Sequence, residues 1–121
     1  MSNNIQKDYF ESILEAILLI EERSVAIKKA EDFVLSSNGT MVLDSIAMRL
    51  QVIGELIKKI EKTDPNILEK YPQVQWPMIM RLRDIISHHY DIIDHEIIFD
   101  ISKKHLPDLK KIVSRIIQEQ A

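Results

Sequence analysis

The stretch that decides the fold is TMVLDSIAMRLQVIGELIKKIE, residues 40–61. Its apolar residues recur at the spacing of one helix face. The residues predicted to face a core are Met41, Ile46, Leu50, Ile53, Ile57 and Ile60. Such a stripe is typical of an α-helix that buries one side against neighbouring helices. We therefore expect a long helix over 40–61 at the centre of the fold.

Helical spacing also covers the segment before this stretch. The polar residues at 2–4 can cap a first helix that extends to about residue 23. Its inner face is predicted at Tyr9, Ile13, Ile17 and Ile20. A shorter helix is expected over 26–35, and the Ser-Ser-Asn-Gly run at 36–39 is expected to form a loop.

Proline residues mark the boundaries after the central stretch. Pro65 should begin a short turn or helix that ends at Pro72. Another helix is expected over 76–90. Asp94 is a predicted cap for a last helical stretch that reaches about residue 119, and Pro107 should kink or divide that stretch.

The composition supports a single all-α domain over residues 1–121. The chain has only 2 glycines and 4 prolines, too few for the many tight turns of a β-sandwich or barrel. Helices of these lengths joined by short loops predict an antiparallel bundle of four to five helices. No apolar run approaches the about 20 residues of a membrane-spanning helix. We expect no membrane association and a cytoplasmic location.

Charge and cysteine content exclude several kinds of site. The chain has no cysteine, which excludes disulfides, thiol catalysis and thiolate zinc sites. Its net charge is −3, so a nucleic acid would have to be bound by a local patch. A stripe of Lys104, Lys111 and Arg115 on the last helix is either a guide for RNA or a protein partner, or ordinary solvated surface.

The segment WPMIMRLRDIISHHY, residues 76–90, has an unusual distribution of charge. On a continuous helix, Arg83 lies at the centre of a stripe that Trp76 and Tyr90 flank at about 20° on either side. Burial of a guanidinium without a partner costs several kcal/mol. The segment therefore predicts a counter-charge, a cleft or an anionic ligand at Arg83.

Two histidines follow at the C-terminal end of this expected helix. Asp84 is i,i+4 from His88, so the two side chains could hydrogen-bond on the helix surface. His88 lies about 140° from Arg83 on an ideal helix. The pair could act together at a distorted helix end, through the reach of the arginine, or in a two-fold dimer with two copies of each residue around one cleft.

This set of groups suits metal-free RNA cleavage. An imidazole can take the proton from a ribose 2′-hydroxyl or give one to the leaving 5′-oxygen, and a guanidinium can hold the phosphate. The structural interpretation competes, because an arginine on such a face is often in an ion pair and histidines often cap helices. Asp91 and His95 also have i,i+4 spacing, but we expect solvated or capping roles for them and no metal site.

The segment resembles the signature of the HepT-like toxin family of the HEPN superfamily, R-x-x-x-x-H-x-Y. Here it reads Arg83-Asp-Ile-Ile-Ser-His88-His-Tyr90. Three flanking features match as well: Ile53-Gly54-Glu55, the Pro72-x-x-x-Trp76 approach to the motif, and Asp94 after it.

The resemblance implies a HEPN-like homodimer, formed through the motif helix, that acts as a ribonuclease toxin without a metal or cofactor. Arg83 and His88 take the catalytic roles, with Asp84 and Ser87 as supporting residues. The implied partners are RNA and a nucleotidyltransferase antitoxin of the MntA type, which silences the toxin by adding AMP to Tyr90.

One position departs from the family pattern, and another leaves two candidates for the motif histidine. Asp84 stands where the family usually has asparagine, so its carboxylate could orient His88 or could oppose an RNA phosphate. His89 follows His88 directly, and the fixed offset to Tyr90 favours His88.

Two other functions are consistent with the residues. One is a non-catalytic subunit that binds nucleotide or substrate for a minimal nucleotidyltransferase. The other is a helical dimerisation module with Arg83 in an ion pair. Glu55 is one candidate partner for Arg83, while Gly54 is expected to mark a close contact between helices.

Overall fold

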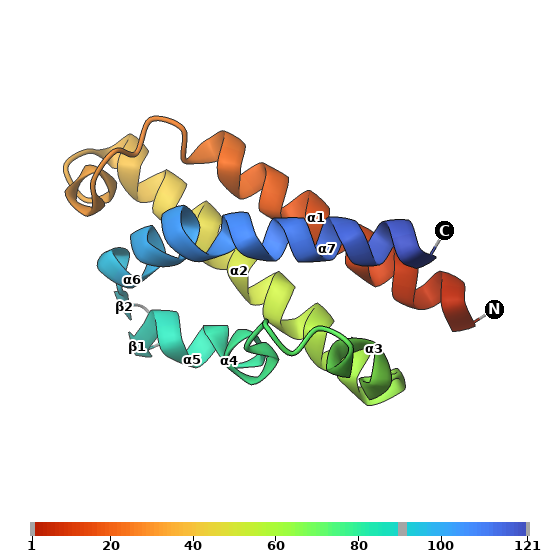
Figure 1. Cartoon of the computed structure of the whole chain (residues 1–121). Helices are drawn as coiled ribbons and strands as arrows, with labels where there is room; N and C mark the ends of the chain where they lie inside the picture. The colour runs from red at the N-terminus through yellow and green to blue at the C-terminus, as the bar shows by residue number, and fades with distance from the viewer. Residues whose placement is uncertain (1, 90–91, 121) are drawn as a thin grey trace.

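Two long helices, α1 (Ser2–Arg23) and α2 (Ser37–Thr63), carry the core in the computed structural model, which describes residues 2–89 and 92–120. They pack against each other, and α7 (Leu106–Gln120) lies against α1 and runs antiparallel to it (Figure 1). The predicted all-α helical bundle is confirmed. None of the described helices is both long and apolar enough to cross a bilayer.

The central stretch forms the helix that its spacing predicts. Ile46, Leu50 and Ile53 of α2 have no exposed surface, and Phe10 and Ile13 of α1 are equally buried. Burial of such side chains stabilises the fold by about 1.5–3 kcal/mol each.

The prediction that Met41 faces the core is wrong, because 66% of its surface is exposed. Leu43 takes the inward position instead. Residues two positions apart on a helix lie on nearly opposite faces, so Leu43 and Met41 cannot both face inward.

The prediction of a helix over 26–35 is wrong. This segment contains only a short 3₁₀-helix, η1 (Ala30–Phe33). The Asp32 carboxylate accepts hydrogen bonds from the backbone N–H groups of Lys28, at 2.8 Å, and Lys29, at 3.1 Å. The bond from Lys28 is the main reason why the pKa of Asp32 lies below its ordinary value. Such side-chain bonds to nearby backbone favour turns over helix.

The prediction of a loop over 36–39 is also wrong, because α2 begins at Ser37. Ser36 is its N-cap, and the Ser36 hydroxyl accepts a hydrogen bond from the Gly39 N–H at 2.9 Å. Serine is among the residues preferred at this position. The polar run is therefore a helix start and not a loop.

The segment after α2 folds back along it. α3 (Pro65–Glu69) follows the predicted proline start, and α4 (Trp76–Met80) then packs on α2. A Cβ atom at Gly54 would lie 2.7 Å from the carbonyl oxygen of Ile79, so the predicted close contact between helices is confirmed. Buried Trp76 fixes the start of α4, because its Nε1 donates to the carbonyls of Leu68 and Tyr71 at 3.0 Å each.

The prediction of a continuous helix over 76–90 is wrong. The helix that begins at Trp76 is interrupted at Arg81, and the chain resumes as α5 (Leu82–Ile86) before it enters the strand β1 (Ser87–His89). β1 pairs antiparallel with β2 (Ile92–Ile93). Ser87 is already extended, at φ −134° and ψ 121°, and β-branched and polar residues around it are weak helix formers.

The last helical stretch begins and divides as predicted. The Asp94 carboxylate accepts from the N–H groups of Glu96 and Ile97, both at 3.1 Å, and caps α6 (His95–Asp100). A π-helix, η2 (Ile101–His105), then joins α6 to α7 just before Pro107. Proline removes one helical hydrogen bond and crowds the preceding turn, and a local π segment accommodates both effects.

We predict that Gly54→Ala lowers the free energy of unfolding by about 1–3 kcal/mol, because the new methyl group forces α4 away from α2. The matched control is Met48→Ala at an exposed position of the same helix, which should change stability by less than about 0.5 kcal/mol. Urea denaturation of both variants measures this. Equal stability of the two variants would contradict the close contact.

Candidate active site

The motif residues lie on α5 and on the hairpin that follows it. Leu82 and Ile86 are i,i+4 and buried, and they anchor α5 to the core. Arg83 and Asp84 lie between these anchors in sequence and are exposed. The expectation that Arg83 sits in a buried apolar stripe is therefore wrong. Arg81, at φ −105° and ψ 17°, interrupts the helix between α4 and α5.

The hairpin is closed by hydrogen bonds next to the motif. The Asp94 N–H donates to the Ile86 carbonyl at 2.8 Å, and the Ser87 hydroxyl donates to the Ile92 carbonyl at 3.1 Å. The pairing is irregular between Ser87 and His89. These bonds fix the backbone of His88 directly after the helix that carries Arg83.

Part of the predicted site lies outside the described residues. This holds for Tyr90 and Asp91 and for the side chains of His88 and His89. The roles assigned to His88 and Tyr90 stay predictions.

The end of α5 at Ile86 corrects one geometric expectation. Asp84 and His88 are not i,i+4 partners on a helix surface, because His88 belongs to β1. The expectation that Arg83 and Tyr90 share one stripe stays a prediction, because Tyr90 lies outside the described residues. Any contact between these groups has to be made through the hairpin or through a second copy of the chain.

The exposed guanidinium of Arg83 can reach a ligand in solvent. Arginine binds phosphate through two parallel N–H donors and stays charged at all physiological pH values. Trp76, by contrast, is a buried core residue and offers no stacking surface for a base.

The carboxylates and histidines of the described part of the chain do not gather in groups of three that could hold a metal ion. Asp100 instead meets Lys104 at 3.1 Å and His105 at 3.5 Å, all on the exposed surface. The hydrogen bond from Lys104 lowers the pKa of the Asp100 carboxyl. Lys104 is thus engaged within η2, whereas Lys111 and Arg115 lie on α7.

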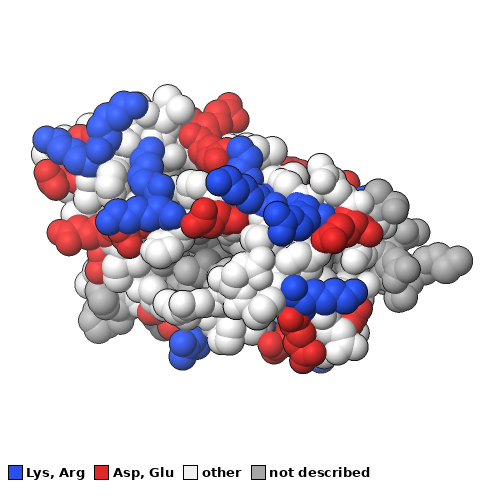
Figure 2. All heavy atoms as spheres, viewed as in Figure 1, with Lys and Arg blue, Asp and Glu red and all other residues white. Residues whose placement is uncertain are grey.

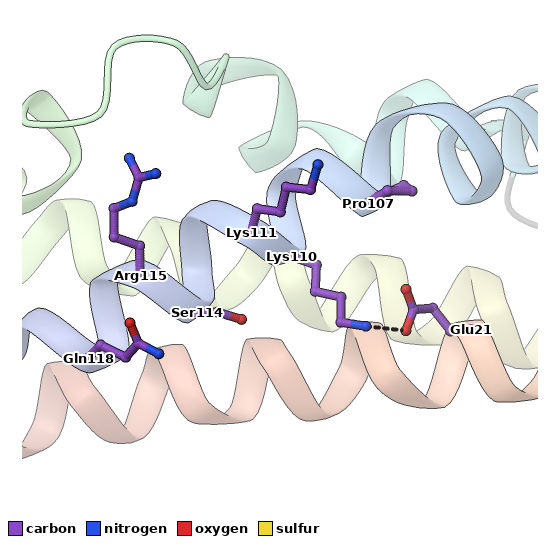
Figure 3. Close-up of a pocket in the computed structure, with 7 residues that line it drawn as sticks. All are labelled: Glu21, Pro107, Lys110, Lys111, Ser114, Arg115 and Gln118. Carbon is purple, nitrogen blue, oxygen red and sulfur yellow. Dashed lines mark hydrogen bonds and ion pairs between the residues drawn. The ribbon is translucent and has the colours of Figure 1, made fainter.

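A second surface feature was only partly expected from the sequence. A groove of about 530 Å³ lies along α7 and takes in Glu21 of α1 (Figure 3). Lys110 forms an ion pair with Glu21 at 2.9 Å, and Lys111 and Arg115 line the same groove. Lys111 and Arg115 belong to the basic stripe that the sequence predicts on the last helix. Lys110 and Glu21 are 89 residues apart, and no local pattern could have joined them.

Comparison with known proteins places this chain in a family. The family model described as Ribonuclease HepT-like matches residues 13–116. The chain belongs to the HepT-like ribonuclease family. The resemblance carried by Arg83, His88 and Tyr90 is thereby confirmed at the level of the family. No solved structure matches this HepT-like chain.

Several relatives share much of its length. It is 31% identical over 114 residues to a Caldanaerobacter subterraneus subsp. tengcongensis protein named "Putative RNase TTE0752", covering 94% of this chain and 96% of the relative. It is 34% identical over 107 residues to a Thermococcus cleftensis protein named "Probable ribonuclease HepT", covering 86% and 88%.

Other relatives are longer than the matched region. A Methanocaldococcus jannaschii protein named "Gamma-glutamylcyclotransferase and putative RNase MJ0434" is 33% identical over 113 residues, covering 93% of this chain. The HepT-like chain spans only 48% of that relative and 60% of another from the same organism.

We predict that Arg83→Gln changes the free energy of unfolding by less than about 1 kcal/mol, because exposed charged groups contribute little to stability. Leu82→Ala, one residue away but 7% exposed, should lower it by about 2–5 kcal/mol. Thermal and urea denaturation compare the two. A loss in Arg83→Gln as large as that in Leu82→Ala would make Arg83 a structural residue.

Proposed function

We propose that this HepT-like chain is a metal-independent endoribonuclease, with Arg83 and His88 as its catalytic residues. The observation that carries the proposal is the exposure of Arg83 on α5, directly before the hairpin whose backbone includes His88. Family membership and the names of the relatives support the same class of reaction.

The proposed chemistry needs only this chain's side chains. One His88 imidazole removes the proton from a ribose 2′-hydroxyl, whose oxygen attacks the adjacent phosphorus. The bond from phosphorus to the 5′-oxygen breaks, and a second imidazole donates a proton to that oxygen. The products are a 2′,3′-cyclic phosphate and a free 5′-hydroxyl. Arg83 stabilises the negative charge that develops on the phosphate oxygens.

We propose that a homodimer supplies the second imidazole. A two-fold axis near the motif would bring two copies of Arg83 and His88 to one cleft. Met78 in α4 is 46% exposed and Ile92 in β2 is 50% exposed. These side chains on either side of the motif offer apolar surface that a second copy would cover.

The proposed regulation is the one typical of HepT-type pairs. A nucleotidyltransferase antitoxin of the MntA type would add AMP to the Tyr90 hydroxyl and thereby silence the toxin. Tyr90 follows β1 directly in sequence, close to the residue proposed as base. A phosphate on it would compete with RNA for Arg83 through the same charge-assisted hydrogen bonds.

We predict RNA cleavage by the unmodified chain in excess EDTA, and its loss in Arg83→Ala and in His88→Ala. Removal of one catalytic acid–base group or charge-stabilising donor should lower the rate by about 10²–10⁴-fold. His89→Ala is the matched control and should retain most of the activity. Gel analysis of a labelled RNA measures all four proteins.

Absence of cleavage by the wild-type chain under these conditions would contradict the proposal. If Arg83→Ala then also lost binding to the nucleotidyltransferase or to nucleotide, the non-catalytic subunit would be the better assignment. Dependence of wild-type cleavage on added Mg²⁺ would contradict the metal-free reaction alone.

We predict a gain in mass equal to whole AMP units when the chain is co-expressed with an MntA-type nucleotidyltransferase. Tyr90→Phe should show no gain, because the acceptor hydroxyl is gone, while Tyr71→Phe should be modified like the wild type. Intact-mass spectrometry reads all three. AMP on Tyr90→Phe would move the modification to another residue.

A further inference from the structure

We propose that Lys111 and Arg115 of α7 bind the sugar–phosphate backbone of the RNA and guide it toward Arg83. The proposal rests on the ribonuclease function proposed above and adds a second binding surface to it. The surface consists of Lys111, Ser114, Arg115 and Gln118, all of which line the groove along α7.

The charges of this surface are arranged for an anion. Lys111 and Arg115 are i,i+4, both exposed, and about 5–6 Å apart at their Cβ atoms, so they can contact neighbouring phosphates of one strand. Figure 3 shows both side chains pointing away from α1, on the side of α7 where α4 and α5 lie. The helix that carries Arg83 lies on this same side of α7 (Figure 1).

Two acidic residues near the groove, Glu21 and Glu119, have contacts with other side chains. Glu21 is paired with Lys110 at 2.9 Å, which leaves the charges of Lys111 and Arg115 uncompensated by it. Glu119 is i,i+4 from Arg115 and accepts a hydrogen bond from the Tyr71 hydroxyl. Figure 2 shows a row of Lys and Arg side chains over α7 with acidic ones among them. The charged residues that line the groove are three basic ones and one acidic one, so the lining carries a net positive charge although the chain's net charge is −3.

The chemistry of the lining favours RNA over a protein partner. Protein interfaces depend on buried apolar and aromatic anchors. Of the groove's lining residues only Pro107 is apolar, and none of the large exposed apolar side chains of the described chain lies there. Lysine, arginine, serine and glutamine supply the hydrogen-bond donors that contact phosphate and ribose without reading sequence.

The test compares RNA binding by full-length His88→Ala protein with and without the double substitution Lys111→Gln/Arg115→Gln. Removal of the proposed catalytic base keeps the RNA intact during titration. Fluorescence anisotropy with a single-stranded oligoribonucleotide, over a range of KCl concentrations, gives the affinity and its salt dependence. The matched control is Lys62→Gln, an exposed lysine at the end of α2.

Loss of two phosphate contacts should flatten the slope of log K against log salt by about 1.4 and weaken binding about tenfold at physiological salt. Lys62→Gln should change neither quantity. Circular dichroism should show the same helix content and melting midpoint for all variants. An unchanged slope and affinity in the double variant would overturn the proposal.

Two further outcomes separate this proposal from the others. If the double variant binds RNA normally but loses the nucleotidyltransferase, α7 is a protein-docking surface and the RNA proposal is overturned. Cleavage assays on protein with Arg83 and His88 intact report on the ribonuclease function by themselves. If the wild-type chain cleaves RNA and the Lys111→Gln/Arg115→Gln substitutions change neither binding nor cleavage, only the α7 proposal is overturned. If these substitutions weaken RNA binding but the wild-type chain does not cleave RNA, only the catalytic proposal is overturned.

Discussion

The contact between Gly54 of α2 and the Ile79 carbonyl of α4 determines where the rest of the motif lies. A side chain at position 54 would put its Cβ 2.7 Å from that oxygen, so only glycine allows the two helices to approach this closely. Trp76 holds the other end of α4 through its two hydrogen bonds to backbone carbonyls. With α4 fixed at both ends, α5 starts from a defined position on the core.

The exposure of Arg83 follows from how α5 continues. Leu82 and Ile86 turn inward and take up the apolar contacts, which directs Arg83 to the solvent side. The chain then leaves the helix, and the Asp94 N–H closes the hairpin on the Ile86 carbonyl. An exposed guanidinium next to a closed hairpin is accessible to a phosphate that arrives from solution.

The sequence was sufficient for the parts of the fold that depend on periodicity and on single strong local signals. The apolar spacing predicted α1 and α2, Asp94 was correctly identified as a cap, and Pro107 as a point of division. The close contact at Gly54 was also predictable.

The errors at 26–35 and 76–90 have a common cause. Hydrogen bonds such as those of Asp32 and the β1–β2 pairing compete with helix, and apolar spacing does not report them. The exposure of Arg83 could not be predicted, because a helical wheel assumes a helix without interruption.

We propose that this chain cleaves RNA by attack of the ribose 2′-hydroxyl, with its own side chains moving the protons. The most direct test is a comparison of one RNA with its fully 2′-O-methylated counterpart, both incubated with the unmodified protein in EDTA. We expect the RNA without methyl groups to be cut to fragments with 2′,3′-cyclic phosphate and 5′-hydroxyl ends, and the methylated RNA to stay intact. Cleavage of the methylated RNA at a comparable rate would contradict it.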